Sequence, residues 1–297
     1  MEIIAVVNNK GGVGKTTISR FLAEYFSVVK NERILALDMD PQANFSNRYL
    51  KMEIDPYQQE GRIPPLHSSY DPHSSEDKDW DGRSSIAGIF FGEMVFPYAT
   101  YIDTLEIAPS HSSKLLLAEA VTREEVVQKV YDQLSKFLAL NDVKNSYDKI
   151  IIDTPPSKGP VTISVVRAAT HLLIPSIMEP QPIEGIYGMI HLWKSETLRR
   201  SEHNPLQLVG VLPNSFDRRG IIHKDHYDSL KQEMPNYVLE SKIGRRLIYA
   251  EADADGAVPP SIFMYPDKNV AKQEVLSACQ EIENRMNIKE RMDLYVN

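Results

Sequence analysis

The sequence predicts an α/β protein built on a doubly wound, mostly parallel sheet with helices on both faces. Short apolar runs alternate with longer amphipathic stretches along most of the chain, which is the order expected of strands joined by crossover helices. The short runs are apolar throughout, as is typical of parallel strands covered on both faces. With 297 residues, of which 42% are hydrophobic and 25% charged, the chain can bury one large core. We therefore expect a single domain over residues 1–297.

Six strands are expected where short apolar runs end at polar residues or proline. They span residues 2–7, 33–40, 104–110, 149–156, 171–177 and 206–214. Amphipathic helices are expected between them, at residues 16–29, 123–140 and 184–200. Because strand and helix follow each other in turn, each parallel crossover should be right-handed.

One segment, residues 52–83, does not follow this pattern. It is rich in proline, serine, aspartate and histidine and shows neither the helical nor the strand period. A long stretch of this kind within a compact domain is typical of a surface excursion. We expect a surface insertion here and not a linker between two domains.

Composition limits the classes of function that are open to the chain. Its formal net charge is −8 with a pI near 5.6, so any contact with nucleic acid would need a local basic patch. The single cysteine, Cys279, permits no internal disulfide and no cysteine cluster for a metal, which fits a reducing compartment. No apolar run is long enough to cross a bilayer, and the first residues do not resemble a signal peptide. We expect a cytoplasmic protein without a membrane contact.

The stretch VVNNKGGVGKTTISRFLAEYF, residues 6–26, carries a glycine-rich loop between the first expected strand and the first expected helix. In that context backbone N–H groups and the positive end of the helix dipole converge on one point, where an anion binds. The phosphate-loop pattern G-x-x-x-x-G-K-[ST] requires a glycine five positions before Gly14, but Asn9 stands there, followed by an additional lysine, Lys10. A glycine-rich turn without nucleotide is the alternative interpretation, and the Gly-Lys-Thr sequence argues against it.

Each residue type in the loop suits a triphosphate. Gly11, Gly12 and Gly14 let the backbone approach phosphate oxygens, Lys15 supplies a positive charge, and the Thr16 hydroxyl is a ligand for Mg²⁺. The predicted nucleotide-binding residues are Lys10, Gly11, Gly12, Val13, Gly14, Lys15, Thr16, Thr17 and, for the reason given below, Asn214.

Three aspartates follow the expected strands. Asp153 ends an apolar run where phosphate-loop enzymes keep a second magnesium carboxylate, and Asp38 and Asp40 share one side of a strand because they are two residues apart. Capping of the following helix is the alternative role for Asp40. The sequence thus predicts a site for a nucleoside triphosphate with Mg²⁺ at the ends of these strands.

The combination of KGGVGKTT at residues 10–17, DMDPQAN at 38–44 and DTPPS at 153–157 resembles the ParA/Soj family of deviant Walker ATPases, in the wider group that includes MinD and the nitrogenase iron protein. The resemblance continues in GVLPNSFDRR at 210–219 and KIGRRLIYAEADADG at 242–256, where Gly244 replaces the usual proline. Only the insertion at 52–83 lies clearly outside it.

The resemblance implies a role for each motif residue. Lys10 would reach across an ATP-bound sandwich homodimer to the partner's phosphates, which explains the unusual spelling of the loop. Asp40 would orient the attacking water, so the catalytic residues would be Lys10, Lys15 and Asp40. The metal residues would be Thr16, Asp38 and Asp153, with Asp153 acting through water. Asn214 matches an asparagine that contacts adenine in relatives.

The branches of the group can be separated by sequence. The nitrogenase type needs cysteines for a shared cluster, and one cysteine cannot supply it. The MinD type ends in a basic amphipathic membrane helix, whereas residues 281–297 carry scattered acidic residues and neither Trp nor Phe. No DNA-reading module precedes the loop in this sequence, so we do not expect the self-regulating type with an N-terminal helix-turn-helix.

What remains is a ParA-like ATPase that binds DNA without sequence preference on the nucleoid and responds to a ParB-like or other adaptor protein. Candidate DNA contacts are Arg218, Arg219, Arg245 and Arg246, with Arg219 favoured by the resemblance, although such residues are often only solvated surface. The same chemistry could instead position a protein cargo, such as a carboxysome or a chemoreceptor cluster, or serve a nucleotide-dependent scaffold without DNA binding.

Overall fold

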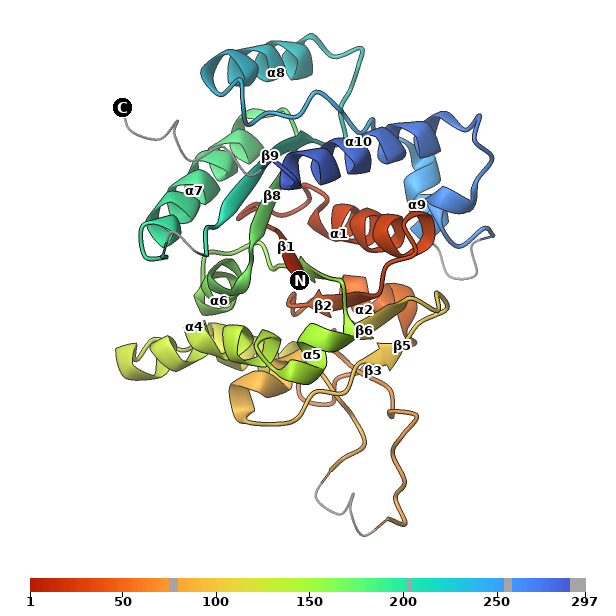
Figure 1. Cartoon of the computed structure of the whole chain (residues 1–297), viewed down its shortest axis with the longest axis vertical. Helices are drawn as coiled ribbons and strands as arrows, with labels where there is room; N and C mark the ends of the chain where they lie inside the picture. The colour runs from red at the N-terminus through yellow and green to blue at the C-terminus, as the bar shows by residue number, and fades with distance from the viewer. Residues whose placement is uncertain (75–79, 202–203, 254–257, 289–297) are drawn as a thin grey trace.

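A computed structural model describes residues 1–74, 80–201, 204–253 and 258–288. A seven-stranded sheet runs through the molecule in the order β5-β6-β2-β7-β1-β8-β9 (Figure 1). Its strands are β1 (Glu2–Val6), β2 (Ile34–Asp38), β5 (Tyr98–Ala99), β6 (Leu105–Ala108), β7 (Lys149–Asp153), β8 (His171–Ser176) and β9 (Gln207–Pro213). All neighbours pair in parallel except β5 and β6. The predicted fold class is confirmed.

The six expected strands all form, each one to three residues shorter than its apolar run. The short antiparallel edge strand β5 was not predicted, because two residues give no readable period. In the centre of the sheet Asp153 pairs with Val6 on one side and with Asp38 on the other. The carboxyl ends of β1, β2 and β7 therefore meet at one edge.

Helices cover both faces of this sheet (Figure 1). They are α1 (Lys15–Glu24), α2 (Asn44–Tyr49), α3 (Ser112–Glu119), α4 (Glu124–Leu138), α5 (Asn141–Ser146), α6 (Pro160–Ala168), α7 (Pro180–Thr197), α8 (Ile221–Glu233), α9 (Leu247–Asp253) and α10 (Val270–Met286). The helix expected at residues 16–29 divides into α1 and a π-helical turn, Tyr25–Val29.

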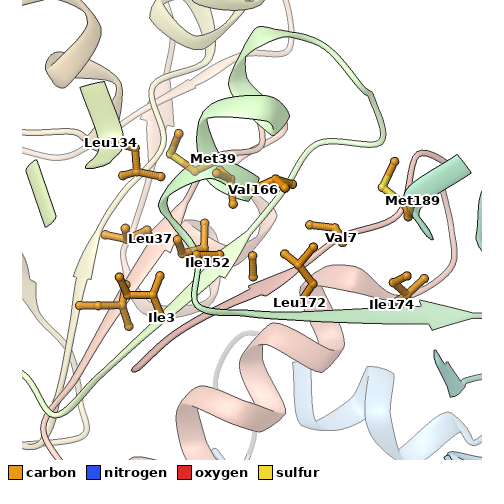
Figure 2. Packing of buried hydrophobic residues seen from close by; sticks show 14 of the residues in the cluster. Ile3, Val7, Leu37, Met39, Leu134, Ile152, Val166, Leu172, Ile174 and Met189 are labelled. Carbon is orange, nitrogen blue, oxygen red and sulfur yellow. The ribbon is translucent and has the colours of Figure 1, made fainter. Parts of the chain in front are cut away.

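Two apolar clusters pack on the two faces, and β1 shows how one strand serves both. Ile3 and Ala5, with Val7 directly after the strand, point to the face covered by α4, α6 and α7, where Figure 2 shows Ile3 and Val7 among other buried side chains. Ile4 and Val6 point to the opposite face, covered by α1 and α10. This period of two within a fully apolar run is the physical basis of the prediction that helices lie on both sides.

The described part of the predicted insertion, residues 52–74 and 80–83, extends away from the sheet in Figure 1. It contains a small antiparallel pair, β3 (Glu53–Ile54) and β4 (Arg62–Ile63). An aromatic cluster holds it to the chain that follows: the His67 ring lies 4.6 Å from the Tyr98 ring, and the Trp80 ring lies 5.3 Å from the Phe96 ring. Residues 75–79 lie outside the described residues, and the assignment of residues 1–297 to one domain stays a prediction.

No helix in the described part of the chain has both the length and the apolar character needed to cross a membrane. The single cysteine, Cys279, lies on α10 and is 2% exposed. Of residues 281–297, which we expect to lack a membrane contact, positions 289–297 lie outside the described residues.

Candidate functional site at the phosphate loop

The phosphate loop, residues 7–14, connects the end of β1 to the start of α1. Gly12 and Gly14 have φ angles of 73° and 88°, in the left-handed region that side chains disfavour. A Cβ atom at Gly14 would also lie 2.1 Å from Asn214 Nδ2. The loop geometry thus requires glycine at position 14 for two independent reasons.

Lys15, the first residue of α1, is 6% exposed, and its Nζ donates to the Lys10 carbonyl oxygen at 3.2 Å. Burial lowers the pKa of the Lys15 amine, and the negative charges of Asp153 and Asp40 oppose that shift. The amine is thus held within the loop, where a bound phosphate would offer a better acceptor than a carbonyl oxygen.

Asp153 lies at the centre of the site, fully buried at the end of β7. Thr16 Oγ1 donates to its Oδ2 at 2.7 Å, and Ser19 Oγ donates to its Oδ1 at 3.0 Å. Burial raises the pKa of Asp153 to about 7; the charge of Asp40 adds to this shift and the two hydroxyl groups oppose it. Sequence reasoning missed Ser19, although a hydroxyl three residues after Thr16 on the same helix face could have revealed it.

Asp38 is also fully buried, and its neighbours define its role in the structure. Its Oδ2 accepts from the backbone N of Ser46 at 2.7 Å and from Ser46 Oγ at 2.6 Å, while Oδ1 accepts from the backbone N of Asp40 at 3.1 Å. Burial first, and then the charge of Asp153, raise the pKa of Asp38. Asp38 thereby holds the first turn of α2.

Asp40 lies beside them and is 8% exposed. Its Oδ1 accepts from the backbone N of Gln42 at 2.9 Å, and burial raises the pKa of its carboxyl group. The residue before α2 is Ala43, so the helix-capping alternative for Asp40 does not describe this structure: the carboxylate that bonds a helix N–H is Asp38.

The donor set fits a hard divalent cation. Hydroxyl and carboxylate oxygens from Thr16, Asp38 and Asp153 converge at this edge, and Mg²⁺ prefers oxygen ligands with only one or two carboxylates. Among the described residues no group of three His, Cys, Asp or Glu side chains forms a complete metal cage. A cation here would need oxygens from water or from phosphate as well.

Lys10 lies at the outer side of the loop, with its side chain 36% exposed. Its Nζ is 3.7 Å from Glu184 Oε2 of α7 in the same chain, and the Glu184 side chain is 74% exposed. Gly185 lies so close to the loop that a Cβ atom there would meet Lys10 Cγ at 2.8 Å. The contact between Lys10 and α7 was missed, because 174 positions separate Lys10 from Glu184 (184 − 10).

Asn214 lies directly after β9 and is 5% exposed. Its Nδ2 donates to the carbonyl oxygen of Val13 at 2.8 Å, so it supports the phosphate loop from beneath. Thr17 faces a different space, a 370 Å³ pocket that it lines with Thr16, Arg20, Asn44, Phe45, Asn47 and Arg48. The roles of these residues toward a nucleotide stay predictions.

The four arginines predicted to contact DNA divide into two pairs. Arg218 and Arg246 both form ion pairs with Glu274 of α10, each at 2.7 Å. Arg219 and Arg245 are exposed, and no ion pair is found for either among residues 1–74, 80–201, 204–253 and 258–288. The structure therefore brings Arg218 and Arg246 together and leaves the other two facing solvent.

Known proteins are similar to this chain in sequence. A family model described as an AAA domain matches residues 1–207. The sporulation initiation inhibitor protein Soj of Bacillus subtilis is 27% identical over 281 residues, covering 95% of this chain and 98% of that protein. The virulence plasmid ParA family protein pGP5-D of Chlamydia psittaci is 26% identical over 98% of both chains.

The fold also matches that of solved structures. An ATP complex of a variant of Cyanothece McdA has a TM-score of 0.70 and 18% identity, covering 96% of each chain. The family model, the curated relatives and the sheet order agree with the motifs that surround the buried aspartates. The chain belongs to the AAA domain family and, within it, to the ParA/Soj family of ATPases.

Proposed function

We propose that this chain is a Mg²⁺-dependent partition ATPase that dimerises when it binds ATP and then binds DNA without sequence preference. The observation that carries this proposal is the site at the end of β1, β2 and β7, where Lys15, Thr16 and three buried aspartates converge. Phosphoryl transfer depends mainly on positioning and on charge stabilisation, and these are the groups that supply both.

Each residue of the site has one task in this proposal. Lys15 binds the terminal phosphates. Its amine donates to the carbonyl oxygen of Lys10 in this structure, and a phosphate oxygen is a stronger acceptor than a carbonyl oxygen. Thr16 and Asp153, with Asp38 beside them, hold Mg²⁺, which neutralises phosphate charge when bound. Asp40 orients and deprotonates the attacking water, and Asp38 fixes the loop on which Asp40 lies.

Dimerisation gives the proposed switch. Lys10 leaves Glu184 and binds the phosphates of the second subunit, as an arginine finger does, so that association depends on the triphosphate. An exposed ion pair contributes only about 0–1 kcal/mol, so the contact with Glu184 offers little resistance to this change.

The names of the curated relatives favour DNA as the cargo. Soj of Thermus thermophilus is described as a chromosome-partitioning ATPase, and pGP5-D as a plasmid ParA family protein. By this analogy, a ParB-like partner stimulates hydrolysis on the nucleoid. Arg219 and Arg245 are the exposed cations that meet DNA phosphates first, since the −8 net charge gives the rest of the monomer little attraction for DNA.

A titration of fluorescent duplex DNA tests this function. Two unrelated sequences are titrated with protein in ATP, in ADP and without nucleotide, each at two salt concentrations. We expect binding only with ATP, equal for both sequences, and weaker by orders of magnitude between low and physiological salt. Equal affinity in every nucleotide state contradicts the ATP switch. No binding in any state, with ATP hydrolysis intact, favours protein cargo or a scaffold.

A further inference from the structure

Glu274 is a carboxylate that serves two arginines at once. Its side chain, on the first half of α10, is 8% exposed. Arg246 Nε donates to Oε2 at 2.8 Å and Arg246 Nη2 donates to Oε1 at 2.7 Å, which is a two-point contact. Arg218 Nη2 donates to the same Oε1 at 2.7 Å. We call Glu274, Arg218 and Arg246 the arginine clamp.

Two uncharged groups also donate hydrogen bonds to the Glu274 carboxylate. The Tyr249 hydroxyl donates to Oε2 at 3.2 Å, and the backbone N of Gly244 donates to the same oxygen at 3.4 Å. Burial by itself would raise the pKa of the Glu274 carboxyl group, but the hydrogen bonds and charge of Arg246, with the charge of Arg218, lower that pKa below its usual value. The same bonds raise the pKa of the Arg246 guanidinium. Glu274 therefore carries a negative charge at neutral pH, beside the arginines predicted to contact DNA.

Position 244 connects the clamp to a departure in the sequence. The ParA/Soj pattern usually has proline here, and proline has no N–H to donate. Gly244 supplies that N–H, and a Cβ atom on this residue would lie 3.3 Å from Glu274 Oε2. The glycine that departs from the pattern therefore lies directly beside Glu274.

We propose that Glu274 limits the affinity for DNA because its carboxylate offsets one of the two positive charges of Arg218 and Arg246. The two guanidinium groups and one carboxylate carry a net charge of about +1 instead of +2, so the clamp releases fewer counterions from a duplex than two free arginines would. Arg219 and Arg245 then provide most of the contact. This inference rests on the proposed DNA-binding function and adds the residue that sets its affinity.

The two arginines differ in how firmly they are held. The Arg246 side chain is 34% exposed and bound through two nitrogens, whereas the Arg218 side chain is 64% exposed and bound through one. A two-point contact is stronger and better oriented than a single one. Loss of the Glu274 charge therefore frees Arg218 first, and Arg218 is the residue whose contribution should change most.

The test measures affinity for duplex DNA in the presence of ATP across a series of salt concentrations. Glu274→Gln keeps the size of the side chain and removes its charge. We expect affinity at low salt to rise about threefold to tenfold and the slope of log affinity against log salt to steepen by about 1–2 per dimer. The matched control is Glu125→Gln on α4, which makes the same change in net charge at an exposed position and should leave both values unchanged.

Arginine substitutions extend the test to protein that keeps Glu274. Arg218→Gln should weaken DNA binding less than Arg219→Gln does, by about twofold against about fivefold or more, because the Arg218 guanidinium is directed to the carboxylate that it shares with Arg246. In the Glu274→Gln background, Arg218→Gln should cost as much as Arg219→Gln. This difference between backgrounds is a coupling that independent sites would not show.

Each outcome decides the matter. An unchanged or weaker affinity in Glu274→Gln overturns the inference while the proposed function stands, provided that the native protein binds DNA. If Glu274→Gln does not fold, an Arg218→Gln effect as large as that of Arg219→Gln overturns the inference in the native background. If neither the native protein nor Glu274→Gln binds DNA in any nucleotide state, both the inference and the proposed DNA function fail.

Discussion

The three aspartates show how neighbours give one residue type different tasks. Asp153 accepts from two hydroxyls of α1, Asp38 accepts from Ser46 at the start of α2, and Asp40 keeps the more open position. Their location was readable from the sequence because each lies at or just after the end of an apolar run. The different roles of the three aspartates were not readable from the sequence, because the fold alone brings Ser19 to Asp153 and Ser46 to Asp38.

Contacts between distant charges were equally hidden from the sequence. Lys10 meets Glu184, and Arg218 meets Glu274, across separations that no period or spacing rule connects. Motif spacing identifies groups that act on a ligand common to a family, but it does not identify the carboxylate that one chain places beside them. The candidate site was therefore predictable at the loop and not at the basic surface.

Two substitutions in the site should separate binding from hydrolysis. Lys15→Gln removes the charge that faces the terminal phosphates and should weaken ATP binding by about 100-fold. Asp40→Ala should leave ATP binding near the native value and lower turnover by about 10²–10⁴-fold, because only the attacking water loses its partner. Isothermal titration and steady-state phosphate release measure the two effects. Tight ATP binding by Lys15→Gln would falsify the site assignment.

Gly14 offers a test of loop geometry with a matched control. Gly14→Ala adds a methyl group both at φ 88° and 2.1 Å from Asn214 Nδ2, so ATP binding should be lost. Gly92→Ala meets a similar φ of 78° but no atom within 4 Å, so it should cost only about 1 kcal/mol of backbone strain and leave ATP binding unchanged. Equal effects of the two substitutions on ATP affinity would contradict the steric argument.

At the scale of elements, sequence periodicity located strands better than their ends. The run at residues 33–40 ends as a strand at Asp38, because Asp38 turns its carboxylate to α2 and the backbone leaves the sheet. Helix α8 was not predicted: its sequence, IIHKDHYDSLKQE, buries only Tyr227 and Leu230, so it lacks a clear apolar stripe. The insertion gave no readable period because β3 and β4 are only two residues long each, and because its aromatic side chains pack against Phe96 and Tyr98 without a regular spacing.

Helix α10 should stabilise the face of the sheet that carries α1. Ile282 is 1% exposed in that apolar cluster, so Ile282→Ala should lower the free energy of unfolding by about 2–5 kcal/mol. On the same helix Val270 is 54% exposed, and Val270→Ala should change that free energy by about 0.5 kcal/mol or less. Urea unfolding curves give both values, and similar losses for the two variants would show that α10 does not pack as described.

For the whole molecule, the property to measure is the formation of a homodimer when ATP binds. In ATP, or in a non-hydrolysable analogue, light scattering should report a doubling of molar mass that ADP does not support. Lys10→Ala should remove this change while leaving ATP binding within about threefold of native, because the amine acts on the partner's nucleotide. Lys51→Ala, an exposed lysine after α2, is the control that should dimerise normally. Normal dimerisation of Lys10→Ala would remove the argument for a lysine acting across the interface.

The position of β1 has a consequence for how the protein is made. Glu2 pairs with Lys149, and Ile4 pairs with His171, so β1 leaves the ribosome well before the strands with which it pairs. Asn214, which supports the phosphate loop, emerges later still. Pairings of such long sequence separation slow folding, and apolar strands that wait for them are exposed to aggregation. The nascent chain should therefore acquire its nucleotide site in a single late step, and its dependence on chaperones should be greatest just before β8 and β9 are complete.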